Sequence, residues 1–330
     1  MAKILITGAS GFVGSFLVRE AIGRGLETYA GIRASSSKDL LPKEGFKYCI
    51  INFDDPDELE KILAVHQFDY IIHNAGVTRT HKNSIYMKVN VDYSVLLAEL
   101  AIKVTSGLKK FVYTSSIESH GSADPTPNGV IDADTDPAPR TTYGLSKLRA
   151  EKALKAIDGL PLIIIRPTAV YGPGERDFFL VFEMIKKYRF TPVSGSKDIK
   201  YTFIYVKDLV RVMLDATVSK QVDKSYFITD GRLYKISQFT DGIAKALKVR
   251  TFGFTIPFPV LSVMVSGIGI FDKITGNKSL LNNEQLAKMK ALNWDCDISP
   301  LVKDFNFQAT YNIEQATAET ANWYLEKGWL

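Results

Sequence analysis

Short apolar runs alternate with longer amphipathic segments through the first half of the chain. The short runs predict strands, and the longer segments predict helices because their apolar residues recur at helical spacing. The expected strands are residues 3–7, 27–33, 46–51, 69–74, 109–115 and 160–166. The expected helices are residues 12–24, 56–65, 82–105 and 141–156. Such alternation is typical of an α/β protein in which helices cover both faces of a doubly wound parallel sheet.

The pattern changes in the second half of the chain. Residues 119–140 are rich in Pro, Asp, Gly and Thr, which indicates a loop. Further helices are expected at 177–188, 206–218 and 312–327, and short strands at 202–205 and 225–229, the last of which returns to the main sheet. We therefore predict a first domain over residues 1–170, with returns near 202–229. A smaller, mostly helical C-terminal lobe is expected over 171–201 and 230–330.

One segment, residues 251–271, contains no charged residue and has the length of a membrane span. Prolines and glycines interrupt it, at Gly253, Pro257, Pro259, Gly267 and Gly269. These residues disfavour a lipid-exposed helix. We expect a buried or pocket-lining helix here rather than contact with a membrane.

Composition and charge exclude several classes of function. The chain has 330 residues and a net charge of +5, with no long run of Lys or Arg, which argues against nucleic acid and suits a small anionic ligand. Cys49 and Cys296 belong to no Cys-x-x-Cys pair, and His is scarce, so no metal site or disulfide is expected. A strand begins at residue 3, which leaves no room for a signal peptide, so we expect a cytoplasmic protein.

Three glycines, Gly8, Gly11 and Gly14, lie between the first expected strand and the first expected helix. Glycine is needed where the backbone turns sharply and approaches a pyrophosphate, which a helix N-terminus then binds through its free N–H groups. The motif predicts that residues 1–170 form a dinucleotide-binding Rossmann domain and that the second lobe binds the substrate. The other residues expected to contact the cofactor in this loop are Ser10, Phe12 and Val13.

The Gly-x-x-Gly-x-x-Gly spacing resembles that of the short-chain dehydrogenase/reductase superfamily. The resemblance continues at Asn52-Phe53-Asp54, at His73-Asn74-Ala75-Gly76 and at Asn90-Val91. It implies that Asn52, Phe53, Asn74, Ala75 and Gly76 contact the cofactor. It also implies that Asn90 supports a water relay to Lys147.

Arg33 ends the second expected strand, where an acidic residue would bind the ribose 2′-hydroxyl of NAD. An arginine can instead pair with the 2′-phosphate of NADP through its planar guanidinium. The sequence therefore favours NADP over NAD, with a surface arginine stacked on the adenine as the alternative.

Tyr143 and Lys147 are four residues apart on an expected helix, which places both side chains on one face. The ammonium group is expected to lower the pKa of the phenol, so that Tyr143 acts as general acid or base. The preceding strand ends in Ser115 and Ser116. Its carboxyl end is where doubly wound sheets place their sites. By resemblance, Ser116 donates a hydrogen bond to the substrate oxygen, and Ser115 or Thr114 faces the nicotinamide.

A last set of motifs resembles the extended subgroup of this superfamily, the NAD-dependent epimerase/dehydratase family. These motifs are Arg166-Pro167-Thr168-Ala169-Val170-Tyr171-Gly172-Pro173-Gly174 and Phe203-Ile204-Tyr205-Val206-Lys207-Asp208. The resemblance implies a cofactor contact at Pro167. It also implies a homodimer that pairs the helices at 82–105 and 141–156.

Departures from the subgroup's patterns discriminate between reactions. Its dehydratases carry an Asp-Glu pair where this chain has Ile117 and Glu118, which disfavours dehydration. Its nucleotide-sugar epimerases carry Asn and Arg where this chain has Ala169 and Tyr201, which removes two anchors for a diphosphate. Lys197 and Lys200 are alternative anchors for the same group. We therefore expect NAD(P)-dependent hydride transfer to or from a small carbonyl or alcohol substrate, with Tyr143 passing the proton. The alternatives are an NAD-dependent nucleotide-sugar epimerase and a non-catalytic dinucleotide-binding regulator.

Overall fold

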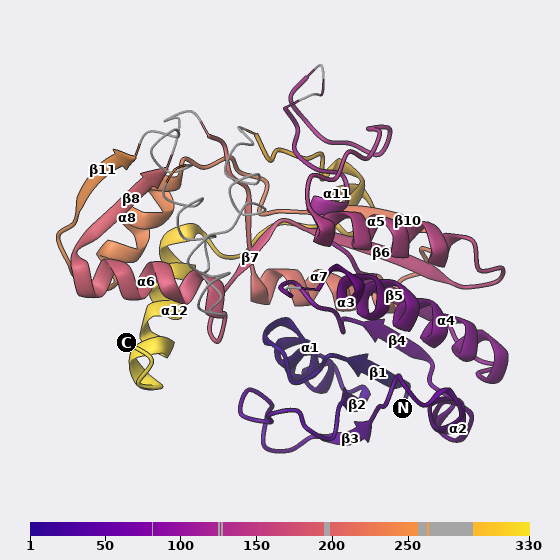
Figure 1. The fold of residues 1–330 in the computed structure, drawn as a ribbon. Coiled ribbons are helices and arrows are strands. Elements are labelled where there is room, and N and C mark those ends of the chain that lie inside the picture. Colours follow the sequence, from indigo (N-terminus) through magenta and orange to yellow (C-terminus); the bar gives the residue numbers. More distant parts are fainter. Residues whose placement is uncertain (81, 125, 127, 195–198, 257–262, 264–292) are drawn as a thin grey trace.

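A seven-stranded sheet organises the chain (Figure 1). The computed structural model describes residues 1–330 except 81, 125, 127, 195–198, 257–262 and 264–292. The strand order is β10-β6-β5-β4-β1-β2-β3, and every pair in this sheet is parallel. The strands are β1 (Lys3–Thr7), β2 (Glu27–Ile32), β3 (Phe46–Ile50), β4 (Tyr70–His73), β5 (Lys110–Thr114), β6 (Leu162–Pro167) and β10 (Lys224–Ile228). The predicted Rossmann sheet, including the return of the strand near 225–229, is confirmed.

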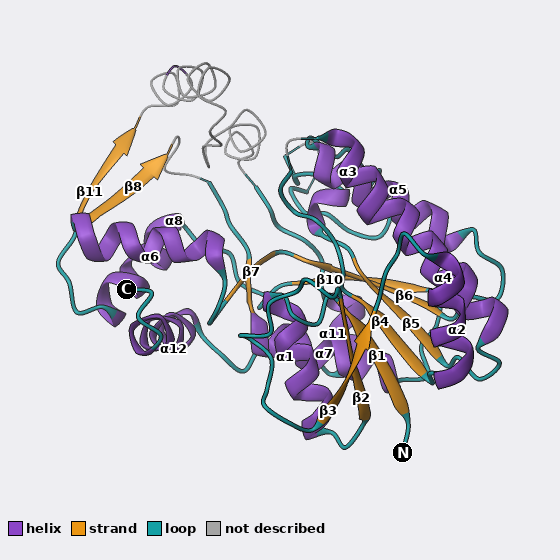
Figure 2. Ribbon diagram, turned by 60° about the horizontal axis from the view of Figure 1, so that its bottom comes forward, coloured by secondary structure: helices purple, strands orange, loops and turns teal. Residues whose placement is uncertain are grey.

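Helices cover both faces of the sheet, as Figure 2 shows. One face packs against α1 (Phe12–Gly23), α7 (Val206–Val218) and α11 (Ser299–Phe305), and the other against α2 (Pro56–His66), α4 (Tyr93–Val104) and α5 (Thr142–Lys155). Alternate residues of β1 divide between the two cores: Ile4 and Ile6 belong to the first, and Leu5 to the second. Because both faces are buried, these strands are continuously apolar, which is the pattern that made them recognisable in the sequence.

The helix predicted over residues 82–105 is not continuous. It comprises α3 (Asn83–Met87), a π-helical turn η1 (Lys88–Asp92) and α4. A π turn inserts one extra residue into the helical ladder and is often found at functional sites. Asn90 lies within it and is completely buried.

The second lobe contains more strand than the sequence predicted. Within the described residues, it contains the helices α6 (Arg176–Tyr188), α8 (Ile236–Ala246) and α12 (Ile313–Glu326). Two parallel pairs accompany them: β8 (Phe190–Ser194) with β11 (Phe252–Ile256), and β7 (Ala169–Tyr171) with β9 (Phe203–Tyr205). The prediction of a helix over 251–271 is therefore wrong at residues 252–256, which form β11. Residues 257–262 and 264–271 of that segment lie outside the described residues. Within the described part, no helix is long and apolar enough to cross a membrane.

Aromatic side chains fill the core of the second lobe. Phe203 stacks on Phe239 with ring centroids 4.7 Å apart, and the ring of Tyr171 meets that of Phe239 edge-on at 5.2 Å. Phe178 and Tyr201 pack against the same cluster. Phe178 and Tyr201 are partly buried and extend this aromatic core.

Two contacts connect the lobe to the loops that follow β2 and β4. The guanidinium of Arg79 pairs with the carboxylate of Asp177 at the start of α6, at 3.0 Å. The turn at Gly174 lies against Leu40 from the loop after β2 and against Trp323 of α12. Both contacts lie beyond the carboxyl ends of the sheet strands, on the side where doubly wound sheets bind ligands.

Asp208 anchors the C-terminal segment to the sheet domain. Its buried carboxylate accepts hydrogen bonds from the backbone N–H groups of Thr310 and Tyr311, at 3.0–3.1 Å, and from Arg211 at 3.0 Å. A carboxylate with these partners is well satisfied, and its removal would leave buried N–H groups without an acceptor. The aspartate in the motif Phe203–Asp208 therefore has a structural role.

We predict that Asp208→Ala lowers the free energy of unfolding by about 3 kcal/mol, because several charge-assisted hydrogen bonds are lost together. Denaturant unfolding followed by circular dichroism measures this change. Asp241→Ala removes an exposed carboxylate on α8 and should change stability by less than about 0.5 kcal/mol. Equal stability of the two variants would contradict the anchoring role.

Candidate active site

The loop between β1 and α1 is shaped by its three glycines. Gly8 has a φ of +65°, and a Cβ at this position would lie 2.8 Å from the backbone of Ala75. A Cβ at Gly14 would lie 2.1 Å from the carbonyl oxygen of Gly8. Two of the three glycines are thus required by close packing of backbone on backbone. This packing brings the segment after β4, which contains Asn74, Ala75 and Gly76, directly against the loop.

The third glycine, Gly11, faces outward. It is exposed, and a Cβ there would meet only the carbonyl oxygen of Gly8, at 3.3 Å. Gly11 is also the N-cap of α1 and provides no side-chain acceptor for the first N–H groups of the helix. Phe12 and Val13 begin the helix, so their N–H groups have no partner within it. An open backbone surface at a helix N-terminus fits a pyrophosphate.

The remaining sequence-predicted cofactor residues lie around this loop. Arg33 is exposed just after β2, and its N–H donates to the Ser36 hydroxyl at 3.1 Å. The amide of Asn52 closes a turn by accepting from the N–H of Asp54. The ring of Phe53 stacks on Tyr93, with centroids 5.0 Å apart. Pro167 lies at the end of β6, beside Ile228 of β10.

The end of β5 meets one face of α5 and there brings together the predicted catalytic residues. Tyr143 lies in the first turn of α5, where the Thr141 hydroxyl caps the helix by accepting from the Gly144 N–H. The Tyr143 side chain hydrogen bonds with Ser116. One turn further along α5, the Lys147 ammonium donates to the carbonyl oxygen of Thr114 at 2.8 Å. The trio predicted from the sequence thus converges at the carboxyl edge of the sheet.

Burial controls the charge of both groups. It raises the pKa of Tyr143 well above its ordinary value, and the nearby Glu118 carboxylate raises it further, while the bond with Ser116 opposes the shift. Burial lowers the pKa of Lys147 to about 8, with the Glu151 carboxylate acting in the opposite direction. The expectation that Lys147 holds the pKa of Tyr143 below its usual range is therefore wrong. The ammonium lies 6.0 Å from the phenol ring centroid, and desolvation dominates.

Thr114 also carries a polar atom suited to a ligand. Within the described residues, its buried hydroxyl has no hydrogen-bond partner. Buried polar atoms are nearly always paired, so an orphan hydroxyl beside Lys147 is unusual. Together with the open surface at Gly11, it supports the fit of a dinucleotide that extends from the glycine loop to the end of β5.

Asn90 holds the loop after β4. Its side-chain N–H groups donate to the carbonyl oxygen of Val77 at 3.0 Å and to the Ser146 hydroxyl at 2.9 Å, and its oxygen accepts from the N–H of Val77 at 2.8 Å. Ser146 in turn donates to the carbonyl oxygen of Tyr143 at 2.7 Å. Asn90 is therefore connected to the first turn of α5, while its part in a water relay stays a prediction.

A buried histidine, His73, extends this network to the glycine loop. Ser94 donates its hydroxyl hydrogen to the carbonyl oxygen of Asn90, so it accepts from the Nε2–H of His73. The Nδ1 atom of His73 then accepts from the Thr7 hydroxyl at 2.8 Å. Burial, with help from the Lys147 ammonium, lowers the pKa of His73 to about 3, so the ring is neutral. The sequence indicated the motif but not this network.

Ser115 has a different partner from the one expected. Its hydroxyl donates to the carboxylate of Glu151, which is buried and paired with the guanidinium of Arg166 at 2.6 Å. The hydroxyl of Ser115 is therefore already engaged, and the expectation that it faces the nicotinamide is not supported by its contacts. His120, to which the sequence assigned no role, packs edge-on against Phe227 at 5.1 Å.

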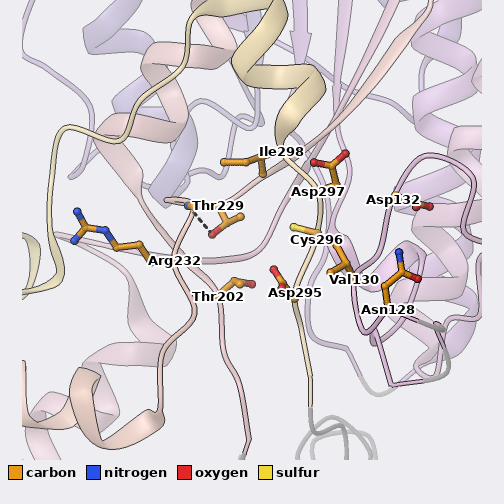
Figure 3. A pocket seen from close by; sticks show the side chains of 11 residues that line it. Asn128, Val130, Asp132, Thr202, Thr229, Arg232, Asp295, Cys296, Asp297 and Ile298 are labelled. Atoms are coloured by element: carbon orange, nitrogen blue, oxygen red, sulfur yellow. Dashed lines mark hydrogen bonds between the residues drawn. The ribbon is translucent and has the colours of Figure 1, made fainter.

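A pocket of about 430 Å³ lies between the loop at residues 128–132 and the segment at residues 295–298 (Figure 3). Thr202, Asp295 and Cys296 contribute to its lining, and Arg232 points away from Asp295. No residue predicted as catalytic or cofactor-binding lines this pocket. The trio and the pocket are therefore separate features of the surface.

Comparison with known proteins gives the context for this geometry. The sequence pattern of the NAD dependent epimerase/dehydratase family matches residues 4–228, from β1 to the end of β10. The chain belongs to this family. The resemblance inferred from the motifs is thereby confirmed.

Relatives of this family member carry out different reactions. It is 28% identical to the UDP-glucose 4-epimerase of Vibrio cholerae, over 83% of the chain and 85% of the relative. It is 24% identical to the 3-beta-hydroxysteroid dehydrogenase of Mycolicibacterium neoaurum, over 99% of the chain and 92% of the relative. Among solved structures, MoeE5 in complex with UDP-glucuronic acid and NAD superposes with a TM-score of 0.76 at 21% identity, over 99% of this chain and all of that one. At 21% identity, the likeness to MoeE5 concerns the fold alone.

We predict that Glu118→Gln lowers the pKa of Tyr143, because a neutral amide no longer disfavours the phenolate. Gln retains an oxygen that can accept from the Thr141 hydroxyl, which binds Glu118 at 2.9 Å. The phenolate absorbance is recorded with rising pH for Glu118→Gln and for the double variant Glu118→Gln, Tyr143→Phe. The difference between the two curves reports the titration of Tyr143. The corresponding difference between the parent chain and Tyr143→Phe is the control. Titration of Tyr143 at an unchanged or higher pH would contradict the prediction.

Proposed function

We propose that this protein binds a nicotinamide dinucleotide and catalyses reversible oxidation and reduction between an alcohol and a carbonyl group of a small substrate. The observation that carries the proposal is the convergence of Tyr143, Ser116 and Lys147 at the end of β5. When bound, a nicotinamide supplies the two-electron donor or acceptor for such chemistry. The pyrophosphate would lie on the backbone of Gly8, Gly11 and Gly14 at the start of α1.

In this proposal Tyr143 exchanges a proton with the substrate oxygen. Its raised pKa keeps the phenol protonated at neutral pH, which is the form that donates a proton to a carbonyl oxygen. Ser116, which already bonds to Tyr143, orients the same oxygen. The charge of Lys147 favours the phenolate left after proton transfer and so lowers the barrier for that step.

The substrate we favour is uncharged rather than a nucleotide diphosphate. Tyr201 occupies the position of the epimerases' arginine, and its ring packs on Phe203 at 6.2 Å within the aromatic core. Ala169 is exposed on β7 and has no polar side chain. Neither residue can make the charge-assisted contacts that a diphosphate requires. This supports net reduction or oxidation of a substrate that lacks such a group.

A nucleotide-sugar 4-epimerase is the second candidate. The relative from Vibrio cholerae favours it, since that protein is named as a UDP-glucose 4-epimerase and aligns over most of this chain. The same trio would serve either reaction, because epimerisation also oxidises and then reduces a single carbon. A non-catalytic dinucleotide-binding regulator is disfavoured because all three members of the trio are present.

The cofactor we propose is NADP in preference to NAD. Arg33 follows β2, and the carbonyl oxygen of Gly31 in that strand accepts a hydrogen bond from the N–H of Ala9 in the glycine loop at 3.3 Å. An exposed arginine two residues after Gly31 suits a 2′-phosphate. A homodimer built on α3–α4 and α5, and a cytoplasmic location, also remain proposals.

We predict that Tyr143→Phe lowers kcat/KM about a hundredfold or more, because it removes the proton donor while preserving the ring. The parent chain and the variant are incubated with NADPH or NADP and a panel of carbonyls, alcohols and nucleotide sugars. Net change in absorbance at 340 nm supports an oxidoreductase. Interconversion of nucleotide sugars without net change supports the epimerase. Turnover unaffected by Tyr143→Phe would contradict both.

We predict that Arg33→Asp reverses the cofactor preference. The carboxylate would repel a 2′-phosphate and accept from a 2′-hydroxyl, so that the Kd for NADPH rises about tenfold or more relative to that for NADH. Fluorescence titration of the two reduced dinucleotides measures both constants. Lys43→Asp changes charge equally at another exposed position of the same loop and should leave the ratio unchanged. A parent chain that prefers NADH would refute the assignment of NADP.

A further inference from the structure

The contact between β5 and α5 includes a third residue beyond the trio's tyrosine and lysine. Tyr143, Lys147 and Glu151 follow one another at intervals of four and so lie on one face of α5. Each contacts one of three consecutive residues at the end of β5. Tyr143 bonds with Ser116, Lys147 donates to the carbonyl oxygen of Thr114, and Glu151 accepts from the Ser115 hydroxyl.

The Glu151 carboxylate is fixed from a second side by Arg166 of β6. The Arg166 Nε donates to both carboxylate oxygens at 3.1 Å, and a terminal nitrogen donates to one of them at 2.6 Å. The side chains are only 2% and 6% exposed. Burial would raise the pKa of Glu151, but Arg166 and Ser115 hold it below the ordinary value, so the group is a carboxylate. A buried pair of this kind has an exacting geometry because any displacement leaves a charge without a partner.

Arg166 is itself confined. Its guanidinium lies over the ring of Phe227 on β10, 5.0 Å from the centroid. His120 packs against the other part of that ring, and burial lowers the pKa of His120 to about 4, with the positive charge of Arg166 acting in the same direction. The ion pair is therefore held between α5, β6 and β10, and none of these contacts leaves it free to move toward a ligand.

Glu151 also acts on the charge of Lys147. In the part of the chain that the structure describes, the titratable groups near the ammonium are His73 at the end of β4, Tyr113 in β5, with its ring centroid 4.8 Å away, and Tyr143 and Glu151 on α5. His73 and the two phenols are neutral at pH 7. Glu151 is therefore the one negative charge among these groups, and it opposes the desolvation of Lys147.

We propose that Glu151 is a positioning residue, which fixes α5 against the end of β5 through Ser115 and Arg166 and supplies the countercharge for Lys147. The proposal rests on the proposed function, because it assigns to Glu151 a part in the chemistry of the trio. The carboxylate is engaged by Ser115 and Arg166. Its effect reaches Tyr143 and Lys147 through the shared helix and through charge.

The first test is the titration of Lys147 in Glu151→Gln, which replaces the charge with an amide of the same shape. Lysine labelled with ¹³C at Cε reports each ammonium group by NMR, and Lys147→Met identifies the signal. We expect Lys147 to titrate at lower pH in Glu151→Gln, and at the parent value in Glu326→Gln, which removes an exposed carboxylate from α12. An unchanged titration in folded Glu151→Gln would overturn the proposal.

This titration needs neither substrate nor cofactor, so it separates the two proposals. If Tyr143→Phe leaves turnover unchanged, the proposed function fails while the Lys147 titration still decides the role of Glu151. If the proposed function holds, Glu151→Gln should lower kcat about tenfold with a change in KM of less than about threefold, because the trio is displaced while the binding surfaces remain. A wild-type kcat would overturn the positioning role.

Ser115→Ala keeps the proposal testable should Glu151→Gln fail to fold. This variant preserves the buried ion pair and removes only the bond between β5 and Glu151. We expect the Tyr143 ring signal, observed with ¹³C-labelled tyrosine, to shift while the Lys147 titration stays near the parent value. A Tyr143 signal and a kcat that both match the parent chain would show that Ser115 and Glu151 do not fix the helix.

Discussion

The alignment of β1, β4 and β5 within one parallel sheet is the constraint on which the remaining features depend. Because parallel strands end at the same edge, the sheet itself brings together the glycine loop, the segment after β4 and the end of β5. No separate long-range contact is needed to place these three segments side by side. Gly8 makes this closeness possible, since any side chain there would collide with Ala75. The helices then present their side chains to an edge that already exists.

Desolvation is the main consequence of placing the trio at this edge. Burial of Tyr143 and Lys147 moves both pKa values toward the uncharged forms. Among the described residues, the Glu118 carboxylate adds to this shift at Tyr143 by disfavouring the phenolate, and the Glu151 carboxylate opposes it at Lys147 by favouring the ammonium. The site thus holds a protonated acid beside a lysine whose charge is sensitive to its surroundings, a combination suited to proton transfer near neutral pH.

The sequence predicted the sheet, most of its helices and the convergence of Ser116, Tyr143 and Lys147, because each depends on local periodicity or on short motifs. It failed where structure depends on distant partners. The strands β8 and β11 pair across some sixty residues of sequence, and each is only five residues long. The charge state of Tyr143 depends on burial, which no spacing reveals. Glu151 did have a signal, four residues beyond Lys147 on the same helical face, but its partners Ser115 and Arg166 come from two other elements.

The π turn at Lys88–Asp92 has a consequence for how this helix tolerates change. An inserted residue rotates everything beyond it by about 100° about the helix axis. Deleting one residue here would restore the regular α-helical pattern of backbone hydrogen bonds. It would also turn Asn90 away from Val77 and Ser146, or Ser94 away from His73, since Asn90 lies within the irregularity and Ser94 lies beyond it. The helix therefore retains a local defect because the two halves serve different neighbours, and a shorter helix would satisfy only one of them.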